Sequence, residues 1–360
     1  MGLTVLYGIQ GTGNGHLARA RCLIPPLRAA GVDIVFLLSG RDKDQFKDSD
    51  LFDHYEYRKG LTMEIKDGKV HPLKTIVKNE NIQFVKDVIS LDLTRIDLVI
   101  SDFEPVTAWA AKLRGKPSIA ISHQSAFEHA VPRVKGFFLS RLIMKLFAPA
   151  NTYLGVLWHH FNQHILPPII EQHVNTEVDP NLILVYMGFE KLEEVINFLS
   201  PFKNFRFMVF ARVESCFRHG NIVVNPISHD EFHKNLERCS GVICNTGFEL
   251  SSECLQLGKK LLTKPIDGQY EQLCNAIALQ SLGRATVMQT LDRGKLDAWL
   301  KLGGHKPIDY PDVAQAVAEW LIESPRRPVS ELSKSLWGSF ENPYSYDEDF
   351  GDIINDKLLC

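Results

Sequence analysis

Residues 1–21 read MGLTVLYGIQGTGNGHLARAR and join three elements in a short space. The apolar run 3–9 predicts a buried strand, and residues 16–30 have the pattern of a helix. The loop between them holds three glycines, Gly11, Gly13 and Gly15. Glycine lets a ligand approach the backbone closely, and the free N–H groups at the start of the helix suit an anion. A tight turn without a ligand is the simpler interpretation of the same pattern.

The spacing of these glycines argues against two common nucleotide sites. A dinucleotide site needs G-x-G-x-x-G and an acidic residue after the second strand. Here the third glycine comes too early, and the second strand runs into Ser39, Gly40 and Arg41. A P-loop needs Gly-Lys-Ser/Thr, whereas Asn14 follows the second glycine of this loop.

Short apolar runs alternate with helical patterns along the whole chain. The runs of the first half are 3–9, 32–38, 96–101 and 118–122, and those of the second half are 182–187, 206–210, 222–224, 241–244 and 260–263. Continuous apolar runs are typical of parallel strands that helices cover on both faces. We therefore predict an α/β protein with two doubly wound domains, 1–165 and 166–325, divided near Pro167 and Pro168, with a helix and an acidic tail at 326–360.

The composition of the chain excludes several classes of protein. Of its 360 residues, 45% are hydrophobic and 23% are charged, as in an ordinary soluble globular protein. The net charge of −3 argues against general nucleic-acid binding, so no nucleic-acid partner is expected. Seven cysteines without a C-x-x-C pair indicate a reducing compartment. Because no run of about 18 apolar residues occurs, we expect a cytoplasmic protein.

His16 and Asp102 are the candidate acid–base pair. His16 stands in the first turn of a helix directly after the glycine loop, where the helix dipole disfavours the imidazolium form. Asp102 ends the strand 96–101, and in a parallel sheet that edge is shared with the glycine loop. A carboxylate there can orient a histidine that removes a proton. A structural histidine, Asp102 as a helix N-cap and Glu104 as a competing acid are the alternatives.

A second cluster of polar residues lies in the stretch 239–276. The strand 241–244 is followed by Asn245, Thr246 and Gly247, and the helix after it carries Glu253. Small residues and free N–H groups at a helix start suit a diphosphate, and a carboxylate can accept both hydroxyls of a ribose. The loop 267–272 adds Gln269, Glu271 and Gln272, whose amides and carboxylate suit a hydroxyl-rich ligand.

These motifs resemble those of GT-B glycosyltransferases, and the chain is most similar to the MurG-like transferases and the UDP-glycosyltransferases, in a bacterial and archaeal branch. GTGNGH resembles their glycine loop, LVISDFEP resembles the strand whose aspartate partners the catalytic histidine, and ILVYMGFE (183–190) resembles the first loop of the donor domain. The donor-binding positions that the resemblance implies are Gly11, Gly13, Gly15, Gly188, Asn245, Thr246, Gly247, Glu253, Gln269, Glu271 and Gln272.

The resemblance also implies a fold and a reaction. Two Rossmann-like domains face each other across a cleft, and a sugar passes from a nucleotide-diphosphate sugar, expected to be a UDP-sugar, to an acceptor hydroxyl. The transfer is expected to be inverting and independent of metals and other cofactors, with His16 as general base and Asp102 orienting it. The same donor site fits a nucleotide-sugar 2-epimerase or hydrolase, or a protein that binds a nucleotide sugar without turnover.

Two further segments are considered as binding sites, one for a metal ion and one for a membrane surface. His160 and His164 are spaced as on one face of a helix beside His159, but no acidic third ligand is evident, so no metal site is predicted. Residues 133–147 interleave aromatic and aliphatic side chains with Arg133, Lys135, Arg141 and Lys145. Such a helix can lie on the inner face of a membrane, where MurG-like enzymes reach lipid-linked acceptors; the alternatives are a core helix and a cover over the acceptor site, which could equally take a glycan.

Overall fold

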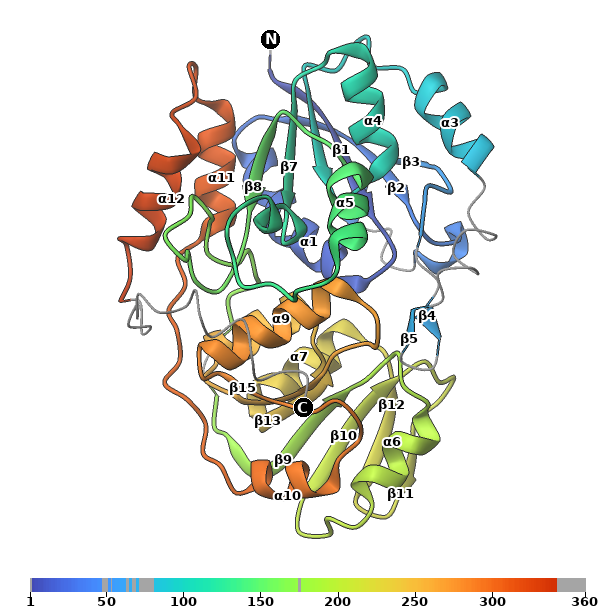
Figure 1. Cartoon of the computed structure of the whole chain (residues 1–360), viewed down its shortest axis with the longest axis vertical. Helices are drawn as coiled ribbons and strands as arrows, with labels where there is room; N and C mark the ends of the chain where they lie inside the picture. Colours follow the sequence, from blue (N-terminus) through green and yellow to red (C-terminus); the bar gives the residue numbers. More distant parts are fainter. Residues whose placement is uncertain are drawn as a thin grey trace.

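The computed structural model describes residues 2–46, 51–52, 54–62, 65–66, 69–70, 81–173 and 176–341. Two α/β domains, each built around a sheet, lie one above the other in Figure 1. The fold predicted from the sequence, two doubly wound domains with parallel sheets, is confirmed. The predicted acidic tail lies outside the described residues from 342 onward.

The N-terminal sheet consists of parallel strands. They are β1 (Thr4–Gln10), β2 (Asp33–Ser39), β3 (Tyr55–Tyr57), β6 (Leu98–Asp102), β7 (Ser118–Ser122) and β8 (Thr152–Gly155), in the order β3-β2-β1-β6-β7-β8. Alternate residues of β1 are buried on opposite faces: Val5 and Tyr7 belong to one core cluster and Leu6 to another. Burial on both faces explains the unbroken apolar runs in the sequence.

The C-terminal sheet repeats this order and adds an edge strand. Its strands are β9 (Asp179–Tyr186), β10 (Arg206–Ala211), β11 (Phe217–His219), β12 (Ile222–Pro226), β13 (Cys239–Asn245), β14 (Lys260–Lys264) and β15 (Ala285–Val287), in the order β11-β12-β10-β9-β13-β14-β15. Only β11 is antiparallel to its neighbour among these strands. Separately, β4 (Ile65–Lys66) pairs with β5 (Lys69–Val70) in antiparallel fashion.

Helices connect the strands and cover the sheets (Figure 1). In the first domain they are α1 (Asn14–Ala29), α3 (Asn81–Ser90), α4 (Pro105–Arg114) and α5 (Phe138–Phe147), with short 3₁₀ turns at Lys43–Gln45 and Gln124–Glu128. In the second they are α6 (Leu192–Leu199), α7 (His229–Arg238), α8 (Phe248–Gln256), α9 (Tyr270–Ser281) and α10 (Arg293–Leu300), and α11 (Val313–Ile322) and α12 (Val329–Trp337) follow.

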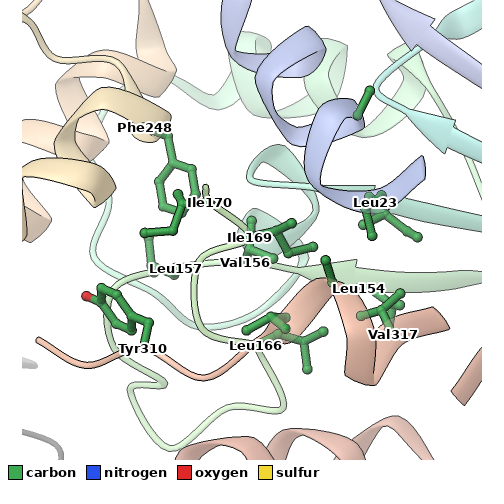
Figure 2. Close-up of a cluster of buried hydrophobic side chains, with 14 of the residues drawn as sticks. Leu23, Leu154, Val156, Leu157, Leu166, Ile169, Ile170, Phe248, Tyr310 and Val317 are labelled. Carbon is green, nitrogen blue, oxygen red and sulfur yellow. The ribbon is translucent and has the colours of Figure 1, made fainter. Parts of the chain in front are cut away.

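Most of residues 156–170, between β8 and β9, are buried, and they join the cores of the two domains. Leu157 and Leu166 from this segment pack with Leu23 of α1 and Phe248 of α8 in one cluster of buried side chains (Figure 2). The segment is not helical: Leu157 N–H donates to Leu166 O at 3.0 Å. The linker therefore contributes to packing rather than acting as a solvated hinge.

Helices α11 and α12 lie beside the N-terminal domain, although the sequence prediction placed residues 313–325 in the C-terminal domain (Figure 1). α11 contacts α1, and its Val317 is fully buried in the same cluster as Leu23. Ser333 and Trp337 of α12 both donate hydrogen bonds of 2.7 Å to the carbonyl oxygen of Ile165. An apolar period predicts a buried helix face but not which domain covers it.

The buried linker histidine His159 predicts acid sensitivity. Its ring accepts the Phe161 N–H at Nδ1 over 3.0 Å, and burial lowers its pKa to about 4, helped by His160. In the unfolded chain this histidine is protonated below about pH 6.5, whereas in the folded protein it stays neutral down to about pH 4. The free energy of unfolding therefore falls by about 3 kcal/mol as the pH drops from about 6.5 to 4. In His159→Asn, whose amide oxygen can accept the same N–H, this loss should be smaller.

The measurement is the free energy of unfolding in urea between pH 4 and 7 for wild type and His159→Asn. His219→Asn serves as the control because His219 is exposed on β11. Equal pH slopes for wild type and His159→Asn would contradict the assignment of the acid sensitivity to His159.

Candidate functional site

The glycine loop and Asp102 lie at the same edge of the N-terminal sheet. β1 and β6 are parallel neighbours, and their register pairs Ile9 with Asp102. The strand order reverses at this pair, so the loops that follow the two strands diverge, which is where α/β sheets bind ligands. The C-terminal domain contacts this edge through Glu249 of α8.

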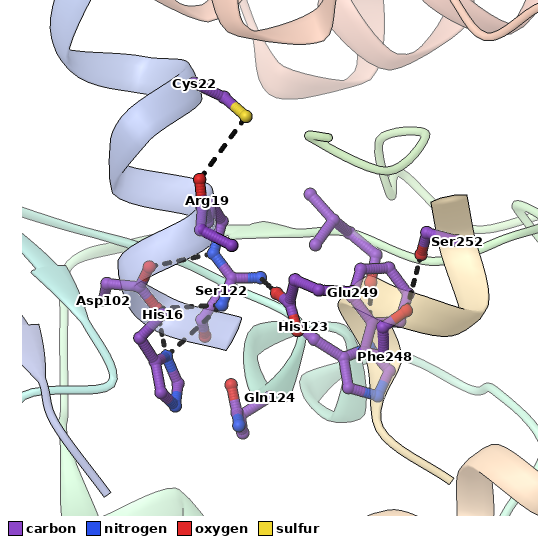
Figure 3. A network of polar contacts seen from close by, with 12 residues as sticks. His16, Arg19, Cys22, Asp102, Ser122, His123, Gln124, Phe248, Glu249 and Ser252 are labelled. Atoms are coloured by element: carbon purple, nitrogen blue, oxygen red, sulfur yellow. Dashed lines mark hydrogen bonds and ion pairs between the residues drawn. The ribbon is translucent and has the colours of Figure 1, made fainter. Parts of the chain in front are cut away.

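Four charged or titratable side chains form one connected network here (Figure 3). His16, in the first turn of α1, holds Nδ1 2.7 Å from Oδ1 of Asp102. Arg19, one turn further along α1, donates from Nε to Oδ2 of Asp102 at 2.8 Å and from Nη2 to Oδ1 at 3.1 Å. Its Nη1 donates to Oε1 of Glu249 at 2.5 Å. Arg19 therefore bridges the two domains while it holds Asp102.

Charge pairing outweighs burial and keeps Asp102 and Arg19 ionised. Asp102 is fully buried and Arg19 is 1% exposed. Burial alone would raise the pKa of Asp102, but Arg19 and His16 hold it below its ordinary value. Burial also works against the guanidinium charge, yet the carboxylates of Asp102 and Glu249 raise the pKa of Arg19. Asp102 is thus a carboxylate that accepts hydrogen bonds from both partners.

Arg19 and Glu249 are functional candidates that the sequence analysis missed. Arg19 follows His16 by three residues, a spacing that places both side chains on one face of a helix, so this signal was available. Glu249 stands 230 residues from Arg19 in the sequence, and only the packing of α8 against α1 reveals the pair.

The alternative that Asp102 caps the next helix is wrong, because Glu104 is the N-cap of α4. Glu104 accepts the N–H groups of Val106 at 2.9 Å and Thr107 at 2.6 Å, and it is fully buried. It is therefore occupied with capping and is not a competing acid. Between the two acids Phe103 has a φ of 53°, a left-handed conformation that is strained for an aromatic residue.

The three glycines of the loop differ in their surroundings. The N–H of Gly11 donates to the Ser39 carbonyl at 2.6 Å, and a Cβ there would collide with this oxygen, so close packing requires this glycine. The backbone of Gly15 lies against the carboxylate of Glu249. Gly13 faces open space and is the glycine of the three whose backbone a ligand can approach freely.

The predicted donor-binding residues gather at the matching edge of the C-terminal sheet. Gly188 follows β9, and Asn245 ends the neighbouring strand β13, at the point where the order of this sheet also reverses. Gly247 is the N-cap residue of α8, and no heavy atom outside its chain neighbours lies within 4 Å of the position that its Cβ would take. Buried oxygen atoms of Asn245, Thr246 and Gln269 have no hydrogen-bond partner among the described residues. Buried acceptors without a partner are rare in folded proteins, so these three oxygens can accept hydrogen bonds from donor groups of a ligand.

Two residues of the loop 269–272 have partners within the protein. Oε1 of Gln272 accepts the N–H groups of Thr246 at 3.2 Å and Ile266 at 3.0 Å, so this side chain holds the loops together. Oε2 of Glu271 accepts Nε2 of Gln124 from the other domain at 3.0 Å. Burial raises the pKa of Glu271. The structure thus brings Glu271 to the interface of the two domains and gives Gln272 a structural contact.

Glu253 lies one turn after Glu249 on α8 and faces histidines. Nε2 of His233 is 3.7 Å from its Oε1, and only 7% of the Glu253 side chain is exposed. Burial alone would raise its pKa, but the neighbouring imidazoles of His173 and His233 hold it below the ordinary value. Burial opposes the protonation of His233, yet Glu253 and Glu171 raise its pKa.

Other histidines of this region make contacts within the protein. His123 follows β7. Its ring stacks on Phe248 with centroids 4.1 Å apart, and its Nε2 lies 2.6 Å from Oδ1 of Asn275 in the C-terminal domain. The expected helical face with His160 and His164 is wrong, because residues 156–170 form no helix. These residues have extended and turn conformations instead, and Pro167 and Pro168 lie among them.

Helix α5 differs from a core helix, one of the alternatives for residues 133–147. None of its residues is buried, and Phe138 is 76% and Leu139 66% exposed. Its C-terminal Phe147 stacks on Phe103 at 4.7 Å, and Phe103 stacks on His16 at 6.4 Å, so the apolar helix leads to the His16 site. No helix among the described residues is long and apolar enough to span a bilayer.

Comparison with known proteins agrees with this architecture. The chain resembles the crystal structure of the kitacinnamycin glycotransferase with a TM-score of 0.59 and 14% identity, over 93% of this chain and 94% of the other. LpCGTa in complex with UDP gives a TM-score of 0.57 at 12% identity, over 94% and 99% of the chains. MurG of Acinetobacter baumannii gives 0.52 at 16%, over 95% and 96%. These likenesses establish the GT-B fold.

The sequence comparison identifies the family. No curated protein matches the chain. The model of the family described as Glycosyl transferase family 1 matches residues 3–302, which include both sheets and the whole His16–Asp102–Arg19–Glu249 network. The chain therefore belongs to glycosyl transferase family 1, and its reaction is the transfer of a glycosyl group.

Proposed function

We propose that this protein transfers a sugar, with inversion, from a nucleotide-diphosphate sugar to an acceptor hydroxyl, with His16 as general base. The observation that carries the proposal is the 2.7 Å contact of His16 with buried Asp102 at the edge that faces α8. Because Nδ1 of His16 is held by Asp102, the other nitrogen, Nε2, is left to receive the acceptor proton. The ionised Asp102 then stabilises the imidazolium that forms.

The donor would lie at the carboxyl edge of the C-terminal sheet. The start of α8 presents free N–H groups behind Gly247, a suitable partner for the charge that grows on the leaving diphosphate. The unpartnered oxygens of Asn245, Thr246 and Gln269 can accept hydrogen bonds from sugar or base. UDP is the favoured nucleotide, since the structurally similar LpCGTa binds UDP. The proposed displacement needs no metal ion at the reacting atoms.

The acceptor would approach along α5. Its exposed apolar residues are Phe138, Leu139, Leu142, Ile143 and Leu146, and Arg141 and Lys145 are exposed between them. An exposed apolar face with cations on the same helix favours an anionic membrane surface that carries a lipid-linked acceptor. The stacked rings of Phe147 and Phe103 connect this face to His16.

Loss of the base should slow transfer without preventing donor binding. General-base catalysis contributes about 10²–10⁴-fold, so His16→Ala should lower kcat by that order. Asp102→Asn should also lower kcat, because a neutral amide supports the imidazolium less well. Transfer from radiolabelled UDP-sugars to extracted lipid and glycan acceptors measures both. A His16→Ala rate within twofold of wild type, beside the exposed control His54→Ala, would refute the role.

A matching nucleotide should stabilise the protein through Glu253. At about 100 times its dissociation constant a ligand adds roughly 2.7 kcal/mol, which raises the melting temperature by several degrees. We expect this rise with UDP or a UDP-sugar in chelator-containing buffer. It should be reduced in Glu253→Gln and retained in Glu193→Gln, a change at an exposed position of α6. An equal rise in Glu253→Gln would contradict contact of Glu253 with the ligand.

Reversal of the charges on α5 should weaken membrane binding. Each basic residue near an anionic surface contributes about 1 kcal/mol, so Arg141→Glu with Lys145→Glu should reduce binding to phosphatidylglycerol vesicles at least roughly 30-fold in a sedimentation assay. Lys234→Glu with Lys301→Glu changes the net charge equally at exposed positions of the other domain. Equal loss in both double variants would contradict a specific role of α5.

A further inference from the structure

Five side chains with metal-binding atoms meet on the C-terminal domain, and one of them, Glu253, also belongs to the proposed donor site. His229 and His233 are four residues apart on α7, which places both imidazoles on one face of that helix. Glu171 and His173 come from the linker before β9, and Glu253 comes from α8. One donor atom each of His173, His233 and Glu253 lie within 4.8 Å of one another, and the same holds for Glu171, His229 and His233.

We propose that His173, His233 and Glu253 bind a divalent transition-metal ion of the zinc type. Two imidazoles and one carboxylate are a ligand set that Zn²⁺ accepts, with a fourth position left over. Ligand atoms about 2.0–2.1 Å from a tetrahedral zinc lie roughly 3.3 Å apart. The 3.7 Å between Nε2 of His233 and Oε1 of Glu253 is close to that separation.

His173 has the surroundings of a metal-binding imidazole. Its side chain is 4% exposed, and Nδ1 lies 3.5 Å from a carboxylate oxygen of Glu237. The opposite nitrogen, Nε2, is buried and has no hydrogen-bond partner. A carboxylate behind one nitrogen with the other directed to a metal is the usual arrangement in zinc sites, because it sets the tautomer and raises the basicity of the ring.

The pair Glu171 and His229 borders the site and is more exposed than its other members. Nε2 of His229 is 3.0 Å from Oε1 of Glu171, and their side chains are 35% and 29% exposed. The pair lies against His233, with ring centroids of His229 and His233 4.2 Å apart. Because donor atoms of both residues lie within 4.8 Å of a donor atom of His233, the pair lies beside the site and is the nearest source of a fourth ligand among the five side chains.

The site would fasten three separate segments to one another. Its ligands belong to the linker, α7 and α8, and the linker is already tied to α8 by the hydrogen bond from His173 N–H to Gln256 at 3.3 Å. Glu253 stands one turn from Glu249, which pairs with Arg19 across the domains. A bound ion would therefore hold α8 and the linker in the arrangement that the interdomain contact requires.

Metal titration of the full chain without a polyhistidine tag tests the proposal. The protein is stripped with a chelator and titrated with Zn²⁺ by calorimetry and with Co²⁺ by visible absorption, without nucleotide, so the outcome is independent of the donor proposal. We expect one equivalent to bind, a Co²⁺ spectrum of a low-coordinate N/O site, and a higher melting temperature with Zn²⁺.

Variants separate this site from adventitious binding. His173→Ala and His233→Ala should each weaken Zn²⁺ binding by more than the roughly 10–100-fold expected from loss of an outer partner such as Glu237→Gln. His219→Ala, at an exposed histidine of the same domain, should bind as wild type does. Melting of the metal-free variants checks their folding. No saturable binding by wild type, or equal binding by the folded His173→Ala and His233→Ala variants, would overturn the proposal.

Discussion

The buried guanidinium of Arg19 is the constraint on which the rest of this structure depends. It is 1% exposed and lies between Asp102 of its own domain and Glu249 of the other. A buried charge of this kind is stable only when its hydrogen bonds are satisfied, and removal of one partner typically costs about 3–5 kcal/mol. The two domains must therefore approach closely enough for Glu249 to reach it. The same guanidinium holds Asp102 in the orientation that His16 needs, so domain contact and site geometry share one interaction.

The apolar contacts around that charge make the domain arrangement specific. Phe248 of α8 stacks on His123 and packs with Leu157 of the linker, while Trp158 donates a 2.8 Å hydrogen bond to Ser252 of α8. α11 returns to the first domain and packs on α1, and α12 packs on α11. Since α8 carries Glu249 at the interface and Glu253 in the histidine cluster, one short helix links the proposed base, the donor site and the proposed metal site.

The sheet edges that carry the candidate site residues could be predicted because the order of parallel strands follows simple rules. The glycine loop, the carboxylate at the end of β6 and the polar residues after β13 all fall at positions where parallel sheets bind ligands. His16 and Asp102 were expected to meet on this ground, and they lie 2.7 Å apart. Their catalytic role stays a prediction. The i and i+4 pair His229 and His233 is equally visible in the sequence and does lie on a helix, whereas prolines and turns prevent the helix expected at His160 and His164.

The sequence by itself determined the two doubly wound domains, their strand edges and the family resemblance, because apolar periodicity and glycine placement act over a few residues. Tertiary structure alone decided which distant groups became partners. Arg19 with Glu249, Glu253 with His173 and His233, and α11 with α1 are pairs that no local pattern specifies. Packing of the two domains brings such groups together after each element has formed, and the free energy of burying charged and apolar surface selects one arrangement among many compatible with the same elements.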